Sequence, residues 1–201
     1  MGIFYECLRA IFSAIFSVFF RYRVTGKENL PKQGGYIIAA NHLSLWDPPL
    51  VATPIPAHLH YMAKQELFQI PVFSAIIRGL GTFPVKRATA DRLAIRTAIN
   101  LLKAGEVVGI FPEGTRSKNG KLQKPEAGLE LIASKAGVPV IPVAIMGTNL
   151  LFRNGNIFPR FEVHFGKAIY PSDKNSGPDH INLTAQVMQS IQNMLDFFHR
   201  P

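Results

Sequence analysis

Short apolar runs alternate along the chain with longer amphipathic stretches. Seven of the runs are rich in β-branched residues and end in polar residues or glycine, a pattern typical of buried strands. These runs are Arg21–Thr25, Tyr36–Ala40, Leu59–Ala63, Thr82–Lys86, Val107–Phe111, Val138–Ile145 and Phe161–Phe165. The stretches between them repeat apolar residues at helical spacing and predict helices at Pro48–Ala52, Glu66–Arg78, Thr89–Ala104, Glu126–Ala136 and Asp179–Phe198.

Strands that alternate with helices predict an α/β fold in which helices flank a largely parallel mixed sheet. The length of 201 residues fits a single domain that buries roughly 70% of the surface exposed by the unfolded chain. Gly105 and Gly137 each follow the last residue of a predicted helix, where a left-handed cap is expected. We therefore expect residues 21–201 to form one globular unit behind a separate N-terminal segment, residues 1–20.

The N-terminal segment is almost continuously apolar from Ile3 to Phe20. Its polar residues recur at intervals of three and four and form one narrow stripe on a helix: Glu6, Arg9, Ser13 and Ser17. The opposite face carries Phe4, Leu8, Ile11, Ile15 and Phe19. This pattern predicts an amphipathic helix that lies in a membrane interface, with Arg21 and Arg23 near lipid phosphates. The alternative is a surface helix that packs on the protein's own core.

Neither a signal peptide nor a membrane-spanning helix fits this segment. It lacks a basic start and a small-residue cleavage pattern, and its charge pair interrupts the ~20 apolar residues that a span needs.

The charge balance indicates anionic partners. The formal net charge is +9, and apolar residues make up 47% of the chain, including fifteen phenylalanines. Phosphorylated small molecules, acidic carrier proteins, nucleic acid and lipid headgroups all fit such a charge. Nucleic acid is disfavoured, because the Lys and Arg residues are scattered among apolar segments and form no base-reading motif. The apolar composition favours a membrane surface.

Disulfide and metal chemistry are not expected. Cys7 is the only cysteine, so no intrachain disulfide can form. The six histidines show no metal-ligand spacing, and we expect neither a metal nor a bound cofactor.

His42 and Asp47 follow the predicted strand Tyr36–Ala40 and can act as a general base with its orienting carboxylate. On one continuous helix a spacing of five would separate the two side chains by roughly 140°, so the chain must turn between them. A loop that enters a helix at Pro48 provides this turn. In a purely structural interpretation Asp47 caps that helix and His42 is a hydrogen-bonded core residue. Both roles are compatible, because a carboxylate has two acceptor oxygens.

A second polar cluster, Phe111-Pro112-Glu113-Gly114-Thr115-Arg116-Ser117, follows the apolar run that ends at Ile110. Gly114 allows a close backbone approach, exposed N–H groups in such a turn can cradle oxygens, and Arg116 offers a bidentate fork to a phosphate. Glu113 would repel a phosphate unless it pairs with a base or holds a hydroxyl. Because both clusters follow buried strands, we expect them to share one site.

Lys64 and Arg87 also follow predicted strands and could add positive charge at the same end of the sheet. Either could equally be an ordinary surface cation.

Together, the two clusters resemble the signatures of the glycerolipid acyltransferase family. The matching residues are His42 and Asp47, with Asn41 before them, and the run from Phe111 to Ser117. The stretch Lys64–Arg87 resembles the second signature block and Val138–Val143 the fourth, so that the resemblance covers roughly residues 20 to 170 in order. The most similar type is the bacterial branch that acylates lysophosphatidic acid.

The resemblance implies direct transfer of a fatty acyl group, with no covalent enzyme intermediate. His42 would deprotonate the sn-2 hydroxyl of lysophosphatidic acid, which attacks an acyl thioester of coenzyme A or of acyl carrier protein and gives phosphatidic acid. Asp47 would orient His42. The substrate-binding residues would be Lys64, Arg87, Glu113, Gly114, Thr115 and Arg116, with the cations on the acceptor phosphate. The donor would be a substrate rather than a cofactor, and the protein would be monotopic on the cytoplasmic face of the cell membrane.

One feature departs from the family pattern, and other functions remain open. Lys124-Pro125-Glu126-Ala127-Gly128 places a glutamate where the family favours a small residue near the acyl pocket, which leaves the chain-length preference open. The acceptor could instead be another lysophospholipid or glycerol 3-phosphate. Outside transfer chemistry, the alternatives are a thioester hydrolase and a non-catalytic anionic-lipid-binding protein.

Overall fold

The computed structural model describes residues 2–86, 91–153, 155–171 and 182–198. Within these ranges the core is a seven-stranded sheet in the order β1-β7-β6-β2-β5-β3-β4. The strands are β1 (Arg23–Thr25), β2 (Tyr36–Ala40), β3 (Leu59–Lys64), β4 (Phe83–Val85), β5 (Val107–Ile110), β6 (Val140–Met146) and β7 (Glu162–Phe165). Strands β6, β2, β5, β3 and β4 run parallel to one another. β7 is antiparallel to β6, and β1 is parallel to β7.

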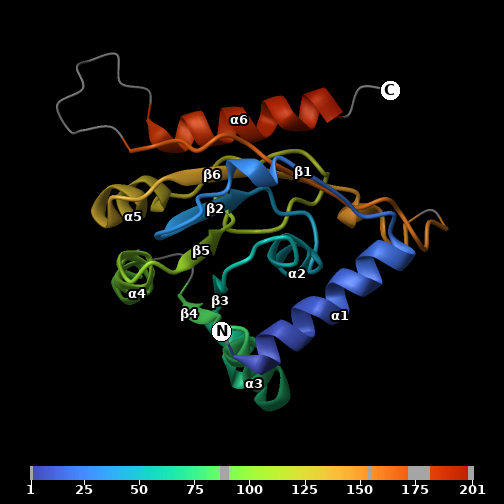
Figure 1. Ribbon diagram of the computed structural model, residues 1–201, viewed down its shortest axis with the longest axis horizontal. Helices are drawn as coiled ribbons and strands as arrows, with labels where there is room; N and C mark the ends of the chain where they lie inside the picture. Colours follow the sequence, from blue (N-terminus) through green and yellow to red (C-terminus); the bar gives the residue numbers. More distant parts are fainter. Residues whose placement is uncertain (1, 87–90, 154, 172–181, 199–201) are drawn as a thin grey trace.

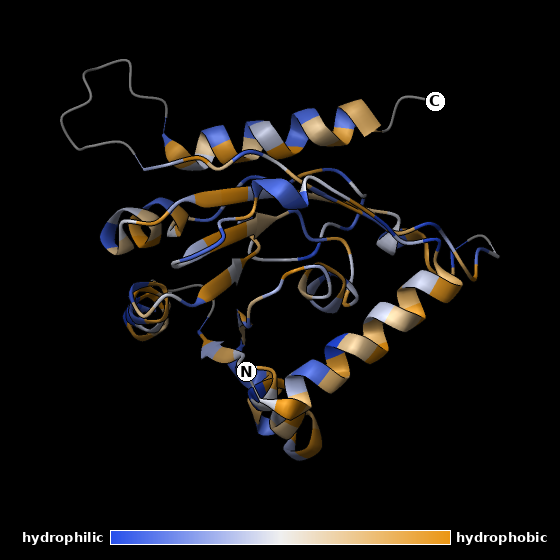
Figure 2. Ribbon diagram, viewed as in Figure 1, coloured by the Kyte–Doolittle hydropathy of each residue, from blue (hydrophilic) through white to orange (hydrophobic). Residues whose placement is uncertain are grey.

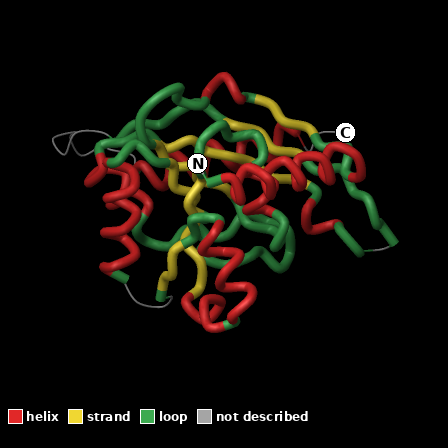
Figure 3. Tube along the Cα trace, turned by 60° about the horizontal axis from the view of Figure 1, so that its bottom comes forward, coloured by secondary structure: helices red, strands yellow, loops and turns green. Residues whose placement is uncertain are grey.

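Helices cover both faces of this sheet (Figures 1 and 3). They are α1 (Ile3–Phe19), α2 (Asp47–Ala52), α3 (Pro71–Gly79), α4 (Arg92–Lys103), α5 (Leu129–Ala136) and α6 (Leu183–Phe198). Side chains of α4, α5 and α6 pack with Ile37 and Ala39 on one face of β2. Side chains of α1 and α2 pack with Ile38 and Ala40 on the other face, as the alternation of a strand requires. The predicted α/β fold with a largely parallel mixed sheet is confirmed.

The predicted strand and helix positions hold to within a few residues, with one exception. The stretch predicted as one helix, Glu66–Arg78, is a 3₁₀ turn at Gln65–Gln69 followed by α3, which begins at Pro71. Proline has no N–H for a preceding turn, and the residue before it is pushed toward extended backbone. Ile70 has φ −87° and ψ 109° for this reason. The predicted helix starts at Thr89 and Asp179 lie outside the described residues.

Helix α1 has two apolar faces. Tyr5, Phe16 and Phe20 are buried in the core, so the helix does pack on its own protein. The opposite side nevertheless leaves large apolar side chains exposed: Ile3, Phe4, Ile11, Val18 and Phe19. Part of the predicted polar stripe turns toward the protein, since Arg9 pairs with Glu6 and donates from Nη1 to the carbonyl oxygen of Ile55 at 3.0 Å. Across the part of the chain that is described, no helix has the length and apolar character to cross a membrane.

Phe16→Ala should lower the free energy of unfolding by about 3–5 kcal/mol, because the ring is fully buried and its loss leaves a cavity. Urea unfolding measures this effect. The matched control is Ile11→Ala on the exposed face, where a change within about 0.5 kcal/mol is expected. Equal effects of the two substitutions would show that α1 is not anchored to the core in this way.

Candidate active site

The five parallel strands point their carboxyl ends toward one edge of the sheet, where ligands bind in open α/β folds. β2 lies between β5 and β6, and the loops after these three strands meet there. The backbone N–H of Ser117 donates to the carbonyl oxygen of His42 at 2.8 Å, which joins the two predicted polar clusters directly. The sequence-based expectation that the clusters lie together is therefore met by the geometry.

His42 and Asp47 are in contact. His42 Nδ1 lies 2.8 Å from Asp47 Oδ2, in a turn that ends where α2 begins with Asp47, Pro48 and Pro49. A carboxylate accepts hydrogen bonds, so a neutral His42 carries its proton on Nδ1 and keeps a lone pair on Nε2. Nε2 has no hydrogen-bond partner among the described residues, and the His42 side chain keeps 12% of its surface accessible to solvent. The ring is thus arranged to accept a proton from a bound molecule.

Asp47 is completely buried, and its carboxylate accepts four hydrogen bonds. Besides His42, Oδ2 accepts from the backbone N–H groups of Leu43 at 2.6 Å and Ser44 at 2.7 Å. Oδ1 accepts from Thr148 Oγ1 at 2.6 Å, and Thr148 is itself buried. The predicted cap on the following helix is wrong: Asp47 is the first residue of α2, the N-cap is Trp46, and no side chain caps the helix. The carboxylate instead accepts from the turn before the helix, and the same oxygen contacts the imidazole.

Two aromatic rings support the imidazole from the side. The His42 ring stacks on Phe111 with centroids 4.0 Å apart and planes within 18°, and Phe111 stacks in turn on Tyr61. Tyr61 is fixed by a hydrogen bond from its hydroxyl to the carbonyl oxygen of Pro48 at 3.1 Å. Burial raises the pKa of Tyr61 well above its ordinary value, which keeps this donor protonated. The His42 imidazole is thus held between the Asp47 carboxylate and this aromatic stack.

Glu113 accepts hydrogen bonds from two main-chain N–H groups around the site. Its Oε1 accepts the backbone N–H of His42 at 2.7 Å, and its Oε2 accepts the backbone N–H of Gln123 at 2.8 Å. Burial raises the pKa of the Glu113 carboxyl, and the two backbone donors act in the opposite direction. The carboxylate therefore connects the loop after β2 to two parts of the β5–α5 connection, and its predicted contact with substrate remains a prediction.

Three of the remaining predicted binding residues, Lys64, Thr115 and Arg116, are exposed. Arg116 has no ion-pair partner among the described residues. Lys64 ends β3 and lies 3.4 Å from Glu66, with both side chains about half exposed. Gly114 has φ +66° and stands so close to Glu126 that a Cβ there would lie 2.9 Å from its Cγ. Arg87 lies outside the described residues.

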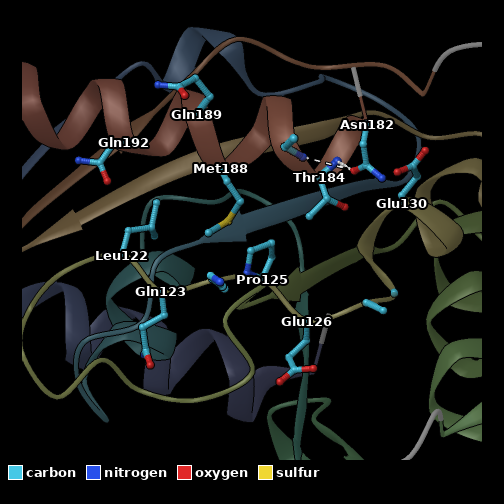
Figure 4. A pocket seen from close by; sticks show the side chains of 14 residues that line it. Leu122, Gln123, Pro125, Glu126, Glu130, Asn182, Thr184, Met188, Gln189 and Gln192 are labelled. Carbon is cyan, nitrogen blue, oxygen red and sulfur yellow. Dashed lines mark hydrogen bonds between the residues drawn. The ribbon is translucent and has the colours of Figure 1, made fainter. Parts of the chain in front are cut away.

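A cavity of about 790 Å³ lies beside this edge, between residues 122–128 and the first half of α6 (Figure 4). Met188 extends from α6 toward Pro125, and Leu122 adds a further apolar wall. Glu126, the departure from the family pattern, lines the cavity. His42 and Asp47 do not line the cavity. Glu113 links the two places, because its carboxylate accepts the N–H of His42 and the N–H of Gln123, which lines the cavity.

Sequence reasoning missed Thr148, Tyr61 and the structural role of Asn41. Asn41 bridges β2 to β6, accepting from the Ile145 N–H at 2.7 Å and donating to the Ile145 carbonyl at 3.0 Å. Thr148 follows Gly147 directly after a buried strand, which is the one signal that could have drawn attention to it. Within the described ranges, no three His, Cys, Asp or Glu side chains gather in a way that could hold a metal.

Comparison with known proteins identifies the family. The Acyltransferase family profile matches residues 21–146, which include both polar clusters. This chain belongs to the acyltransferase family. A 1-acyl-sn-glycerol-3-phosphate acyltransferase from Bacillus subtilis (strain 168) is 34% identical over 184 residues, spanning 87% of this chain and 89% of the relative. A protein of the same name from Streptococcus pneumoniae is also 34% identical, over 84% of this chain and 64% of its own length.

A solved structure has the same fold. The 1-acyl-sn-glycerophosphate (LPA) acyltransferase PlsC from Thermotoga maritima superposes with a TM-score of 0.80 at 30% identity, covering 98% of this chain and 81% of that one. The resemblance that the sequence motifs carry is therefore confirmed, and the prediction of an acyltransferase with it.

Thr148→Val should remove the donor to Asp47 while keeping the side-chain shape. A lost hydrogen bond to a buried charge lowers the free energy of unfolding by about 1.5–3 kcal/mol. A loosened Asp47 should also lower kcat by roughly tenfold or more, because His42 is less well oriented. Thr148→Ser restores the hydroxyl and should recover most of both losses. Activity is measured as acyl transfer across a pH series, and an unchanged kcat and pH profile in a destabilised Thr148→Val variant would mean that Thr148 is only structural.

Proposed function

We propose that this acyltransferase moves a fatty acyl group from a thioester to the sn-2 hydroxyl of lysophosphatidic acid, giving phosphatidic acid. The observation that carries the proposal is the His42–Asp47 pair, 2.8 Å apart and placed beside the loop that contains Arg116. It is supported by the names of the relatives, which match over most of the chain. The acyl donor is either acyl coenzyme A or acyl carrier protein, and each is anionic, as the +9 charge favours.

In this mechanism His42 is the general base. Nε2 takes the proton of the acceptor hydroxyl as its oxygen attacks the thioester carbonyl, and Asp47 stabilises the imidazolium that forms. The carbon–sulfur bond then breaks, and the departing thiolate recovers the proton from His42. No enzyme nucleophile is required. Ser44 instead makes a local contact, its Oγ accepting the backbone N–H of Trp46 at 3.3 Å.

The acceptor phosphate lies against the Glu113–Arg116 loop in this proposal. Arg116 supplies a fork of two N–H donors, and Lys64 adds charge from the end of β3. Gly114 in its left-handed conformation and the exposed Thr115 leave the backbone of the loop accessible. Glu113 shapes the pocket through its hold on His42, and Arg87 would add a further cation.

The enzyme reaches its lipid substrate as a monotopic protein at the cytoplasmic membrane surface. The exposed Ile3, Phe4, Ile11 and Val18 give α1 an apolar outer face, which can enter the headgroup region while Phe16 holds the helix to the core. Residues 1–20 would thus form a membrane-interface segment, and residues 21–201 the acyltransferase domain.

His42→Ala should lower the transfer rate by roughly 10²–10⁴-fold, because the base is lost, while the folded structure is retained. The measurement is phosphatidic acid formation, by mass spectrometry, from lysophosphatidic acid and either thioester. Circular dichroism verifies folding. Substantial transfer by a folded variant would contradict the base assignment, and release of free fatty acid without acceptor by the wild type would indicate a hydrolase.

Arg116→Ala should raise KM for lysophosphatidic acid by roughly tenfold or more and change kcat less, because the lost contact holds the unreactive phosphate. Lys135→Ala, an exposed cation on α5, is the matched control and should leave KM unchanged. Competing acceptors with different headgroups separate lysophosphatidic acid from other lysophospholipids. Equal KM values for the two variants would argue against a phosphate contact at Arg116.

A further inference from the structure

Exposed apolar side chains also gather on α3, near the N-terminal end of α1. Helix α3 buries Ser74 and Ile77 and leaves the larger apolar residues of the opposite side exposed, with Val72 76% accessible. Ile70, Phe73 and Ile76 are exposed as well. A surface helix normally turns its large apolar residues toward the core, whereas α3 leaves most of them exposed to solvent.

A second apolar group lies at the other end of α1, in the loop between β6 and β7. Phe152 is 77% accessible and has φ +60°, a strained conformation for a residue other than glycine. Ile157 and Phe158 are also exposed. The Phe158 ring stacks on Phe19 with centroids 5.6 Å apart, which fixes this loop against α1.

The three segments form one continuous surface. α3 touches the start of α1, because a Cβ on Gly79 would lie 2.8 Å from the Phe4 ring. In Figure 1, α3, α1 and the loop follow one another along the lower right edge of the molecule, and Figure 2 shows α1 coloured mostly as hydrophobic. We call this surface the apolar belt; its members are Ile3, Phe4, Ile11, Val18, Phe19, Ile70, Val72, Phe73, Ile76, Phe152, Ile157 and Phe158.

The turn between His42 and Asp47 packs on the inner side of α1. Trp46, between His42 and Asp47, packs edge-on against Phe12 and Phe16 of α1. Its neighbour Leu45 is 70% exposed. The turn that contains His42 is therefore in contact, through Trp46, with the same helix that carries the centre of the belt.

Cations flank the belt at both ends. Arg21 and Arg153 are exposed beside the C-terminal end of α1, and neither has an acidic partner among the described residues. Arg78 lies on the α3 side, where it packs over the Phe68 ring at 5.0 Å. An apolar strip rimmed by cations matches an anionic lipid headgroup layer, whose phosphates lie above its acyl chains.

We propose that α3 and the Phe152 loop dock on an anionic bilayer together with α1, so that the membrane contact has three parts. The identity of the occupant rests on the proposed function. Contacts at both ends of α1 fix how the molecule sits on the membrane, and they place the Leu45 turn at the lipid surface, beside the lysolipid substrate.

The test measures partitioning of full-length variants onto vesicles of phosphatidylcholine with about one third phosphatidylglycerol. Val72→Ser and Phe152→Gly should each weaken vesicle partitioning by roughly fivefold to tenfold through lost apolar area. Glycine suits the left-handed backbone at position 152, so this variant should fold at least as stably. Matched controls are Leu93→Ser on α4 and Phe197→Ser on α6, with 73% and 65% exposure, which should partition like the wild type.

The single cysteine separates failure of this proposal from failure of the proposed function. Cys7 is exposed on the outer face of α1, and vesicles should shield it from a charged maleimide. If Cys7 is shielded but Val72→Ser and Phe152→Gly partition like the wild type, the three-part contact is wrong while α1 docking stands. If vesicles leave Cys7 reactive, membrane docking by the belt is wrong altogether. Absence of phosphatidic acid formation by the wild type from dispersed short-chain substrate would instead overturn the proposed reaction.

Discussion

The site depends on one buried carboxylate. Asp47 has no contact with solvent, and an unpaired charge in that position would be strongly destabilising. Four donors from two parts of the chain satisfy it: the imidazole, two backbone N–H groups of the turn, and Thr148 after β6. The carboxylate therefore cannot lose its partners without a large cost in free energy, and the need to satisfy it fixes the orientation of the His42 ring.

The parallel sheet makes this arrangement possible. The loops after β2, β5 and β6 begin at the same edge, so residues from distant parts of the sequence come within hydrogen-bonding distance without long excursions of the chain. Asn41 ties β2 to β6, and Glu113 ties the loop after β5 to the backbone of His42. Hydrogen bonds from side chain to main chain thereby set the spacing between His42 and the loop that carries Arg116.

The sequence pattern was enough to predict the strands, the turn between His42 and Asp47, and the meeting of the two polar clusters. These features follow from local periodicity, from Pro48 and from the direction of parallel strands. Thr148 could not be predicted, because a lone threonine after a strand has no distinguishing neighbour. Glu113 was recognised as unusual, but its bonds to main-chain N–H groups depend on loop conformations that no pattern encodes. The pattern offered core packing and membrane exposure of α1 as alternatives, and it did not predict that one helix does the first while leaving an apolar face exposed.

The reversal of β7 relative to β6 has a mechanical consequence. The connection between these strands starts and ends near the catalytic edge, and it carries Thr148 close to its beginning and Phe152 four residues later. The hydroxyl that donates to Asp47 and the exposed Phe152 ring thus belong to one short connection. A change in the backbone at Phe152 can therefore reach the hydrogen bond between Thr148 and the buried carboxylate.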